Sequence, residues 1–309
     1  MKQGASRSGL AAEFVLPSFA KLNLALEVLH LRSDGYHELR TLYQSVDLRD
    51  ELHFKLPRPG DCSIDLVTEG YEPCPAQENL VYRAAMLLRR ECGIRRGARI
   101  RLVKRIPSGA GLGGGSSNAA VALLGLNRLW NLKLGAAGMA SLAMKLGSDV
   151  PFFLVGGTAL GIGRGEQVFP VAHPDFRWAV ILHPPVHVST ARAYAQLRRP
   201  LTSKLSAATI SRLGLLMSDG KWEADRCFND FEVDALKRYP EIRAARETLL
   251  KHGALAAQLS GSGSAVFGIF PNRDRAHRAL SRIERHPWKA YLVKTVDRTC
   301  YRRALGESS

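Results

Sequence analysis

A glycine-rich stretch in the first half of the chain has the composition of an anion-binding loop. The sequence PSGAGLGGGSSNAA, residues 107–120, carries five glycines, followed by two serines and an asparagine. Glycine is favoured where the backbone must bend tightly or let a ligand approach closely. A strand-like run precedes the stretch and a helix-forming run follows it, so the first N–H groups of that helix are free to bind a phosphate. We therefore predict a phosphate-binding loop rather than a simple turn.

The better-known phosphate loops do not match this stretch. A Walker loop needs a lysine after its last glycine, and none follows here. Gly109, Gly111 and Gly114 fit the dinucleotide pattern G-x-G-x-x-G, but that site also needs an acidic residue about 20 positions later to bind ribose. No Asp or Glu lies between Glu91 and Asp149, which disfavours a Rossmann oxidoreductase. The H-R-D and D-F-G motifs of protein kinases are also absent, so the loop is of another kind.

Two further polar sites have the residue types needed for proton and phosphate chemistry. The run KLNLALEVL, residues 21–29, alternates in polarity and predicts a half-buried strand with Lys21 and Asn23 on its polar face. A solvated side chain is the usual state of a lysine in such a position. Asp149 stands two residues before Pro151 in GSDVPFF, where the local sequence favours a helix cap. Its alternative role is that of a proton acceptor.

The elements that would position these residues alternate along the chain without a regular βαβ rhythm. Hydrophobic periodicity predicts strands at 21–29, 39–48, 98–106, 178–184, 265–270 and 289–296, and a glycine-rich hairpin over 155–168. It predicts helices at 79–91, from 116 onward, at 136–146, 191–197 and 274–285, and further helices up to about 252. This mixture favours an α+β fold over a doubly wound parallel sheet.

Composition restricts the classes of protein to which the chain can belong. A length of 309 residues suggests two domains, and a net charge of +16 favours an acidic partner, either nucleic acid or a phosphorylated small molecule. Basic residues are not interleaved with aromatic ones in the way that base-stacking proteins require, so no nucleic acid is expected. The uncharged, largely apolar run 150–163 is too short to span a bilayer. The five cysteines are widely spaced and form no zinc or disulfide pattern, which favours a cytoplasmic location.

The loop PSGAGLGGGSSNAA resembles the ATP loop of the GHMP kinases, a superfamily of small-molecule kinases. Three further stretches resemble its branch that phosphorylates 4-diphosphocytidyl-2-C-methyl-D-erythritol: AKLNLALEVLHLRSDGYHELRTLYQSVDL, GSDVPFFLVGGTALGIGRGE, and NDFE together with LSGSGSAVFGIF. The resemblance covers residues 17–296. Another GHMP kinase, of the homoserine or mevalonate type, is the alternative, and the D-G-Y-H turn argues against it.

The resemblance implies a two-domain α+β fold with the active site in the cleft between the domains. Residues 1–16 would be a flexible extension, 17–170 an ATP-binding domain similar to domain 2 of ribosomal protein S5, and 171–309 a ferredoxin-like substrate domain. The implied reaction transfers the γ-phosphoryl group of ATP to the 2-hydroxyl of the cytidylyl substrate, in the non-mevalonate pathway to isoprenoid precursors. The resemblance is compatible with a monomer or a homodimer.

The resemblance also assigns roles around the transferred phosphate. Lys21 and Asp149 would be the catalytic pair, and Asn23 would contact the substrate. Lys104 and Asn79 would approach the adenine. The loop that would bind ATP consists of Pro107, Ser108, Gly109, Ala110, Gly111, Leu112, Gly113, Gly114, Gly115, Ser116 and Ser117. No dedicated metal site is visible, and Ser117 is the candidate protein ligand for the Mg²⁺ that accompanies ATP.

The remaining implied roles concern the cytidine end of the substrate. Tyr36 would stack on the cytosine ring, and His37 would form hydrogen bonds with its polar edge. Tyr194 would cover the other face of the ring, with Thr190 nearby, although Tyr194 also fits a helix residue that packs inward. A second glycine-containing loop, Gly261, Ser262 and Gly263, would line the site near the substrate phosphates.

Overall fold

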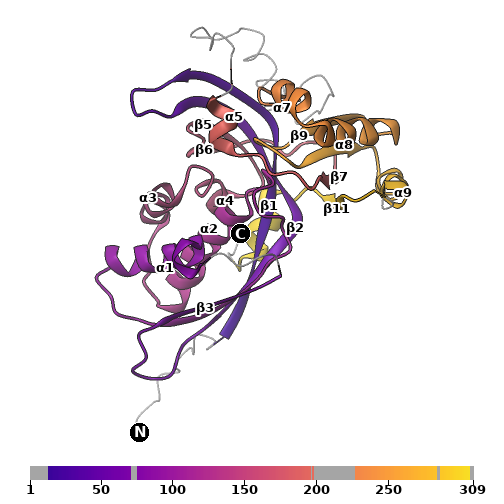
Figure 1. The fold of residues 1–309 in the computed structure, drawn as a ribbon. Helices are drawn as coiled ribbons and strands as arrows, with labels where there is room; N and C mark the ends of the chain where they lie inside the picture. Colours follow the sequence, from indigo (N-terminus) through magenta and orange to yellow (C-terminus); the bar gives the residue numbers. More distant parts are fainter. Residues whose placement is uncertain (1–12, 71–74, 196, 198–226, 284–285, 307–309) are drawn as a thin grey trace.

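The computed structural model describes residues 13–70, 75–195, 197, 227–283 and 286–306 (Figure 1). Its strands are β1 (Glu13–Leu31), β2 (His37–Lys55), β3 (Ile64–Glu69), β4 (Ala98–Val103), β5 (Thr158–Gly163), β6 (Gln167–Pro170), β7 (Trp178–His183), β8 (Phe228–Asn229), β9 (Ala256–Leu259), β10 (Val266–Phe270) and β11 (Lys289–Lys294). Its helices are η1 (Ala76–Glu78), α1 (Leu80–Glu91), α2 (Gly114–Leu129), α3 (Ala136–Leu146), α4 (Phe152–Val155), α5 (Thr190–Ala195), α7 (Glu232–Arg238), α8 (Pro240–Lys251), α9 (Arg273–Ile283) and α10 (Arg298–Ala304).

The first sheet is built around the two longest strands, β1 and β2, which are 19 residues long each and pair antiparallel. Strand order is β3-β4-β2-β1-β8, and β5 with β6 joins at β2. One half of β2, Glu51–Lys55, pairs with β4, and the other half, Leu39–Gln44, pairs with β5. Register shifts in the β1–β2 ladder mark β-bulges, which bend and twist a strand pair. Because one end of β2 pairs with β4 and the other with β5, the β1–β2 pair passes through both halves of the molecule (Figure 1).

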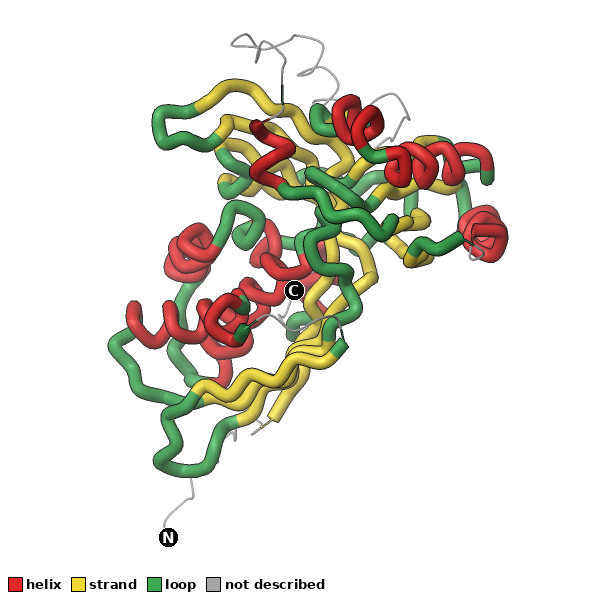
Figure 2. Tube along the Cα trace, viewed as in Figure 1, coloured by secondary structure: helices red, strands yellow, loops and turns green. Residues whose placement is uncertain are grey.

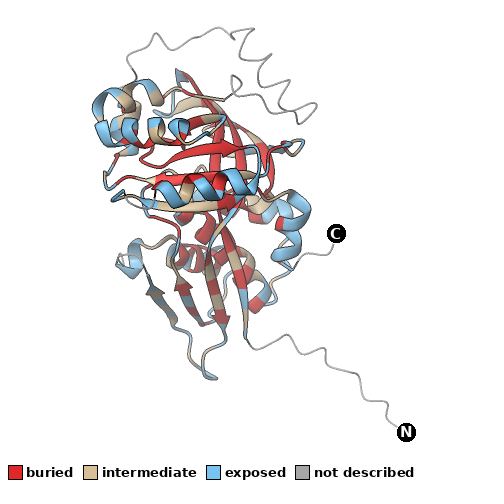
Figure 3. Cartoon of the chain, turned by 90° about the vertical axis from the view of Figure 1, so that its right-hand side faces the viewer, coloured by how far each residue is buried: buried red, intermediate tan, exposed pale blue. Residues whose placement is uncertain are grey.

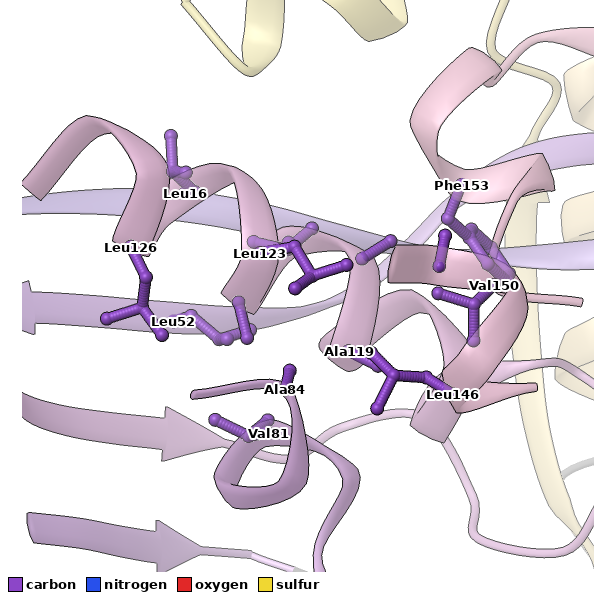
Figure 4. Close-up of a cluster of buried hydrophobic side chains, with 14 of the residues drawn as sticks. Leu16, Leu52, Val81, Ala84, Ala119, Leu123, Leu126, Leu146, Val150 and Phe153 are labelled. Atoms are coloured by element: carbon purple, nitrogen blue, oxygen red, sulfur yellow. The ribbon is translucent and has the colours of Figure 1, made fainter. Parts of the chain in front are cut away.

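The helices of the first layer, α1 to α4, cover one face of this sheet (Figure 2). Leu123 and Leu126 of α2 belong to the same buried cluster as Leu16 of β1 and Leu52 of β2 (Figure 4). A side chain at Gly125 would overlap the ring of Phe54, so this glycine lets α2 approach β2 closely. The helix that follows the glycine loop is thereby fixed in place by the core.

The second sheet has the antiparallel order β11-β7-β10-β9, with α7, α8 and α9 packed on its outer side (Figure 1). Its inner face packs against β1. Leu22 and Leu24 of β1 share a buried cluster with Ile181 of β7 and Phe267 of β10. In the described residues, no helix is both long enough and apolar enough to cross a membrane.

β1 is buried on both of its faces along the middle of the strand (Figure 3). The prediction of a half-buried strand was wrong, because the second sheet covers the leucine face and the glycine loop covers the polar face. Lys21 is 3% exposed and Asn23 is 2% exposed, so neither is a solvated surface residue. Strand alternation correctly predicted that both residues lie on the same face, but it could not predict what covers that face.

Most predicted elements are present, and several boundaries differ. The helix predicted at 136–146 coincides with α3, and the predicted hairpin is β5–β6. β1 already begins at Glu13, so residues 13–16 belong to the sheet and not to an extension. Residues 198–226, where helices were expected, lie outside the described residues, as do 1–12. The helix α10 returns to the first layer, where Tyr301 joins the core. The division at residues 170 and 171 stays a prediction.

Candidate active site

The glycine loop connects β4 to α2, as the sequence predicted. Gly109, Gly111 and Gly113 have positive φ angles of 67°, 79° and 70°, a region that residues with a side chain rarely adopt. No side chain caps α2 at its start, Gly114. The partial positive charge of the helix N-terminus therefore faces the space beside the loop.

Two of the loop glycines are required by close packing as well as by backbone conformation. A side chain at Gly111 would overlap the carbonyl oxygen of Ser260, in the loop between β9 and β10. A Cβ atom at Gly113 would lie 2.7 Å from Cζ of Phe153 and 3.0 Å from Cγ of Lys21. The loop is thus held directly against β1 and against the second sheet.

A cavity of about 340 Å³ lies on one side of the loop. Its lining includes the predicted loop residues from Pro107 to Ser116, together with Asn79 and Lys104. Both of these side chains already have partners. Oδ1 of Asn79 accepts the N–H of Val81 at 2.9 Å and so caps α1, and Nζ of Lys104 is ion-paired with Asp50. The structure brings the predicted nucleotide residues together around this cavity.

A larger cavity of about 690 Å³ lies on the other side of the loop. It shares Gly111, Gly113 and Ser116 with the smaller cavity, so the loop forms the boundary between the two. The predicted residues that line it are Lys21, Asn23, Tyr36, His37, Asp149, Thr190, Tyr194, Gly261 and Ser262. Gly263 lies in the same turn but does not line the cavity.

Lys21 and Asp149 face each other at the floor of the larger cavity. Nζ of Lys21 lies 3.8 Å from Oδ2 of Asp149, 2.5 Å from Oδ1 of Asn23 and 2.7 Å from the carbonyl oxygen of Gly111. The side chain of Lys21 is 4% exposed and that of Asp149 is 35% exposed, so the carboxylate is open to the cavity. Asp149 makes no side-chain cap for α4, and the local prediction of a helix cap was therefore wrong.

Burial shifts the pKa values of Lys21 and of the neighbouring Tyr43. Desolvation lowers the pKa of the Lys21 ammonium, and the neighbouring carboxylate of Asp149 raises it in part. Burial raises the pKa of the Tyr43 hydroxyl well above its ordinary value, and Asp149 raises it further. Tyr43 is consequently neutral at physiological pH and acts as a hydrogen-bond donor.

Tyr43 is a site residue that sequence reasoning missed. Its hydroxyl donates to Oδ1 of Asp149 at 2.9 Å, and its ring stacks on Phe152, with centroids 4.7 Å apart. It lies on β2, opposite Asn23 in the β1–β2 register. Strand alternation would have placed it on the same sheet face as Thr41, but only the pairing register brings it beside Asp149.

We expect Tyr43→Phe to lower kcat by about 10–100-fold, because the lost hydrogen bond is one to a charged group. The KM for a substrate that binds in the smaller cavity should change little, since Tyr43 does not line that cavity. Steady-state kinetics with each substrate varied in turn would measure both constants. Tyr82→Phe, on the outer part of α1, is the matched control, and an unchanged kcat in Tyr43→Phe would contradict the role of this hydroxyl.

Aromatic side chains line the other end of the larger cavity. The rings of His37 and Tyr194 stack with centroids 5.1 Å apart, and Tyr194 packs edge-on against Phe231 at 4.9 Å. Tyr36 is 53% exposed, and the Arg164 guanidinium lies 4.7 Å from its ring centroid. The ring of His37 thus lies directly against that of Tyr194, and no open space separates them. Arg164 and Phe231 were not predicted from the sequence.

The loop between β9 and β10 is fixed by side-chain hydrogen bonds. Nδ2 of Asn229 donates to the carbonyl oxygens of Leu259 and Gly261 at 2.9 and 2.8 Å. Oγ of Ser262 lies 2.9 Å from Oγ1 of Thr190, at the start of α5. Thr190 is therefore held beside this loop.

The predicted Mg²⁺ ligand, Ser117, points away from both cavities. It is fully buried, and its hydroxyl is hydrogen-bonded to that of Ser18 at 2.7 Å. Ser116, one residue earlier, lines both cavities. The described residues contain no group of three or more His, Cys, Asp and Glu side chains that could hold a metal alone.

The sequence and the fold are similar to those of known kinases. The sequence matches the family described as GHMP kinases N terminal domain over residues 79–157 and that described as GHMP kinases C terminal over 205–290. A crystal structure of 4-(cytidine 5'-diphospho)-2C-methyl-D-erythritol kinase has a TM-score of 0.75 at 36% identity, covering 91% of this chain and 99% of that one. Homoserine kinase from Cytophaga hutchinsonii shares the fold, with a TM-score of 0.70 at 21% identity, covering 96% of this chain and 98% of that one.

The fold and the two matched families define the chain as a GHMP kinase, an ATP-dependent kinase of small molecules. The 4-diphosphocytidyl-2-C-methyl-D-erythritol kinase of Pelotomaculum thermopropionicum is 42% identical over 278 residues, which cover 90% of this chain and 96% of that protein. The chain belongs to the family of 4-diphosphocytidyl-2-C-methyl-D-erythritol kinases. The predicted GHMP kinase fold is confirmed, and the Rossmann alternative was wrong.

Proposed function

We propose that the protein transfers the γ-phosphoryl group of ATP to the 2-hydroxyl of 4-diphosphocytidyl-2-C-methyl-D-erythritol. The observation that carries this proposal is the position of the Lys21–Asp149 pair. The pair lies in the larger cavity, beside the glycine loop that separates this cavity from the smaller one. The phosphoryl donor, ATP, bound in the smaller cavity and the acceptor alcohol bound in the larger one would meet at this boundary. Transfer of a phosphoryl group requires this proximity.

Asp149 has the geometry of a proton acceptor. Its Oδ1 accepts from the Tyr43 hydroxyl, whereas Oδ2, which lies 3.8 Å from Nζ of Lys21, can also accept a hydrogen bond from the substrate hydroxyl. Lys21 has three N–H donors, of which two are taken by Asn23 and by the carbonyl oxygen of Gly111. The third can offset negative charge that develops on the transferred phosphoryl group.

The residues beside the loop fit a Mg²⁺ ion that enters with the nucleotide. Mg²⁺ usually keeps several waters and binds one or two protein groups along with substrate phosphates. The Ser116 hydroxyl and the Asp149 carboxylate are among the side-chain oxygens that line the larger cavity, and they could bind the ion. When bound, the ion would neutralise charge on the β- and γ-phosphates.

The aromatic end of the larger cavity suits the cytidine part of the substrate. Arg164 covers one face of Tyr36, which leaves the other face for a pyrimidine ring. The turn that carries Arg164 also approaches Asp149, because Gly165 packs against the Tyr43 hydroxyl. Arg164 lines the larger cavity, and its guanidinium is the group that we expect to bind the substrate diphosphate.

Phosphoryl transfer to a panel of alcohols tests the proposal. The purified protein with ATP and Mg²⁺ should phosphorylate 4-diphosphocytidyl-2-C-methyl-D-erythritol, and homoserine and mevalonate should be poor acceptors. ³¹P NMR of the product would identify the phosphorylated hydroxyl. Preferred phosphorylation of homoserine or mevalonate would overturn the assignment.

We expect Tyr36→Ala to raise the KM for the cytidylyl substrate by about 10-fold or more, because base–aromatic stacking contributes on the order of 1–3 kcal/mol. The KM for ATP should remain near that of the parent, since Tyr36 lies outside the smaller cavity. Both constants can be obtained by varying one substrate at saturation of the other. Phe169→Ala, an exposed aromatic on β6, is the control. Equal effects on both KM values would contradict the stacking role.

A further inference from the structure

A buried polar cluster lies behind the glycine loop, outside the larger cavity. We call it the Asp50 cluster; it consists of Ser18, Asp50, Lys104, Ser117 and Asn118. Its residues come from β1, β2, the segment after β4, and the N-terminal part of α2. Ser18, Asp50 and Ser117 are fully buried, and Asn118 is 3% exposed. A charged group this deep in a protein needs partners for all of its polar atoms.

Every acceptor position of the Asp50 carboxylate is occupied. Oδ1 accepts the backbone N–H groups of Arg105 and Ile106 at 2.6 and 2.8 Å. Oδ2 accepts the ammonium of Lys104 and, at 2.9 Å, the Nδ2 group of Asn118. Because Arg105 and Ile106 immediately precede Pro107, the carboxylate holds the first end of the glycine loop.

The same cluster holds the second end of the loop. Nδ2 of Asn118 also donates to Oγ of Ser18 at 2.8 Å, and Ser18 donates to Oγ of Ser117 at 2.7 Å. Oδ1 of Asn118 accepts from Nζ of Lys104 at 3.1 Å. The segments before and after residues 107–116 are thus joined to one carboxylate, which spans the base of the loop.

Asp50 also forms an ion pair with the Lys104 ammonium, which lies in an electrostatically unfavourable position. A Cβ atom at Gly114 would lie 3.2 Å from Nζ of Lys104. The ammonium is therefore next to the N-terminus of α2. The helix dipole makes that end positive, so a cation there is destabilising unless an anion accompanies it. Asp50 supplies the anion and leaves the N-terminus available for a phosphate.

We propose that Asp50 is a positioning residue for ATP, which pre-organises the glycine loop and Lys104 without touching the nucleotide. A loop that is already ordered loses less conformational entropy when the ligand binds. The inference rests on the proposed function only in taking the glycine loop as the ATP site. It does not depend on the identity of the acceptor alcohol.

Nucleotide affinity measured without an acceptor tests this inference. Asp50→Asn should raise the Kd of Mg·ATP, determined by calorimetry on the full chain, by about 10-fold or more, because it removes hydrogen bonds to a charged group. The KM for the cytidylyl substrate should stay within about 2-fold, since none of the five residues of the Asp50 cluster lines the larger cavity. Asp47→Asn is the matched control, because Asp47 lies on the same strand but accepts the N–H of Lys294.

An exchange of two side chains provides a rescue. In the double variant Asp50→Asn with Asn118→Asp, Oδ1 of the new amide can still accept the N–H groups of Arg105 and Ile106. Its Nδ2 group can donate to the new carboxylate, which also pairs with Lys104. The hydroxyls of Ser18 and Ser117 can rotate to donate in the reverse direction. This variant should recover most of the ATP affinity lost by Asp50→Asn.

The outcomes separate positioning from general stability. An unchanged ATP affinity in Asp50→Asn would overturn the inference, and so would a folded double variant that binds ATP no better than Asp50→Asn. If both variants fail to unfold cooperatively, the cluster serves the fold and the inference is also overturned. If ATP affinity depends on Asp50 but the cytidylyl substrate is not phosphorylated, the inference stands and the proposed function fails.

Discussion

Asp149→Asn is expected to lower turnover by about 10²–10⁴-fold, the usual contribution of a positioned proton acceptor. The asparagine has the same shape, and its amide oxygen can still accept from the Tyr43 hydroxyl, which preserves the local geometry. What is lost is the basic oxygen that faces the cavity near Lys21. Discontinuous or coupled kinase assays would give kcat, and calorimetry would show whether the affinity for Mg·ATP stays near the parent value.

The control for this substitution is Asp65→Asn, an exposed carboxylate on β3 that lines neither cavity. It should have the kinetic constants of the parent. A parental kcat in Asp149→Asn would remove Asp149 from the mechanism. A large loss of ATP affinity with little loss of kcat would instead assign it to nucleotide binding.

Lys21→Met should lower kcat/KM by about 10²–10³-fold, because a pre-organised cation beside the transferred phosphoryl group is lost. The pH dependence gives a second, independent readout. The protonated ammonium is the form that offsets charge, so activity should fall as pH rises through the pKa of Lys21. Burial lowers this pKa, and the fall should therefore begin below the ordinary value of 10.5. Burial raises the pKa of Tyr43, so Tyr43 does not account for this fall.

Lys21→Arg distinguishes the charge from its titration. A guanidinium remains protonated throughout the alkaline range, so whatever activity this variant retains should not decline there. Asp149→Asn should shift the decline of its residual activity to lower pH, because the carboxylate raises the pKa of Lys21. Profiles of kcat/KM against pH for the three proteins provide the measurement. An alkaline decline in Lys21→Arg identical to that of the parent would show that another group titrates.

The sequence was most informative where local periodicity and motif spacing determine geometry. A two-residue period placed Lys21 and Asn23 on one face of β1, and both line the larger cavity. The strand–loop–helix order around the glycine loop was also predicted correctly. Burial could not be predicted in the same way. The second sheet that covers the leucine face of β1 is formed by residues more than 150 positions later in the chain.

The residues that were missed or misplaced depend on contacts between distant segments. Tyr43 and Asp149 are 106 positions apart, and the Lys104–Asp50 pair spans 54 positions, so no local pattern connects them. The two serines at the start of α2 are equivalent in sequence. The helical turn directs Ser117 into the core against Ser18, whereas Ser116 lines the cavities. One step along a helix rotates a side chain by about 100°, which decides which serine faces the ligand.

The attachment of the glycine loop to the second sheet restricts how the enzyme can exchange its ligands. The backbone N–H of Ala265 donates to the carbonyl oxygen of Ala110 at 3.0 Å, and Oγ of Ser260 donates to that of Gly111 at 3.0 Å. A hinge between the two halves would have to break these bonds and expose the apolar cluster that β1 shares with β7 and β10. The glycine loop and the second sheet are therefore expected to move together when ligands enter and leave.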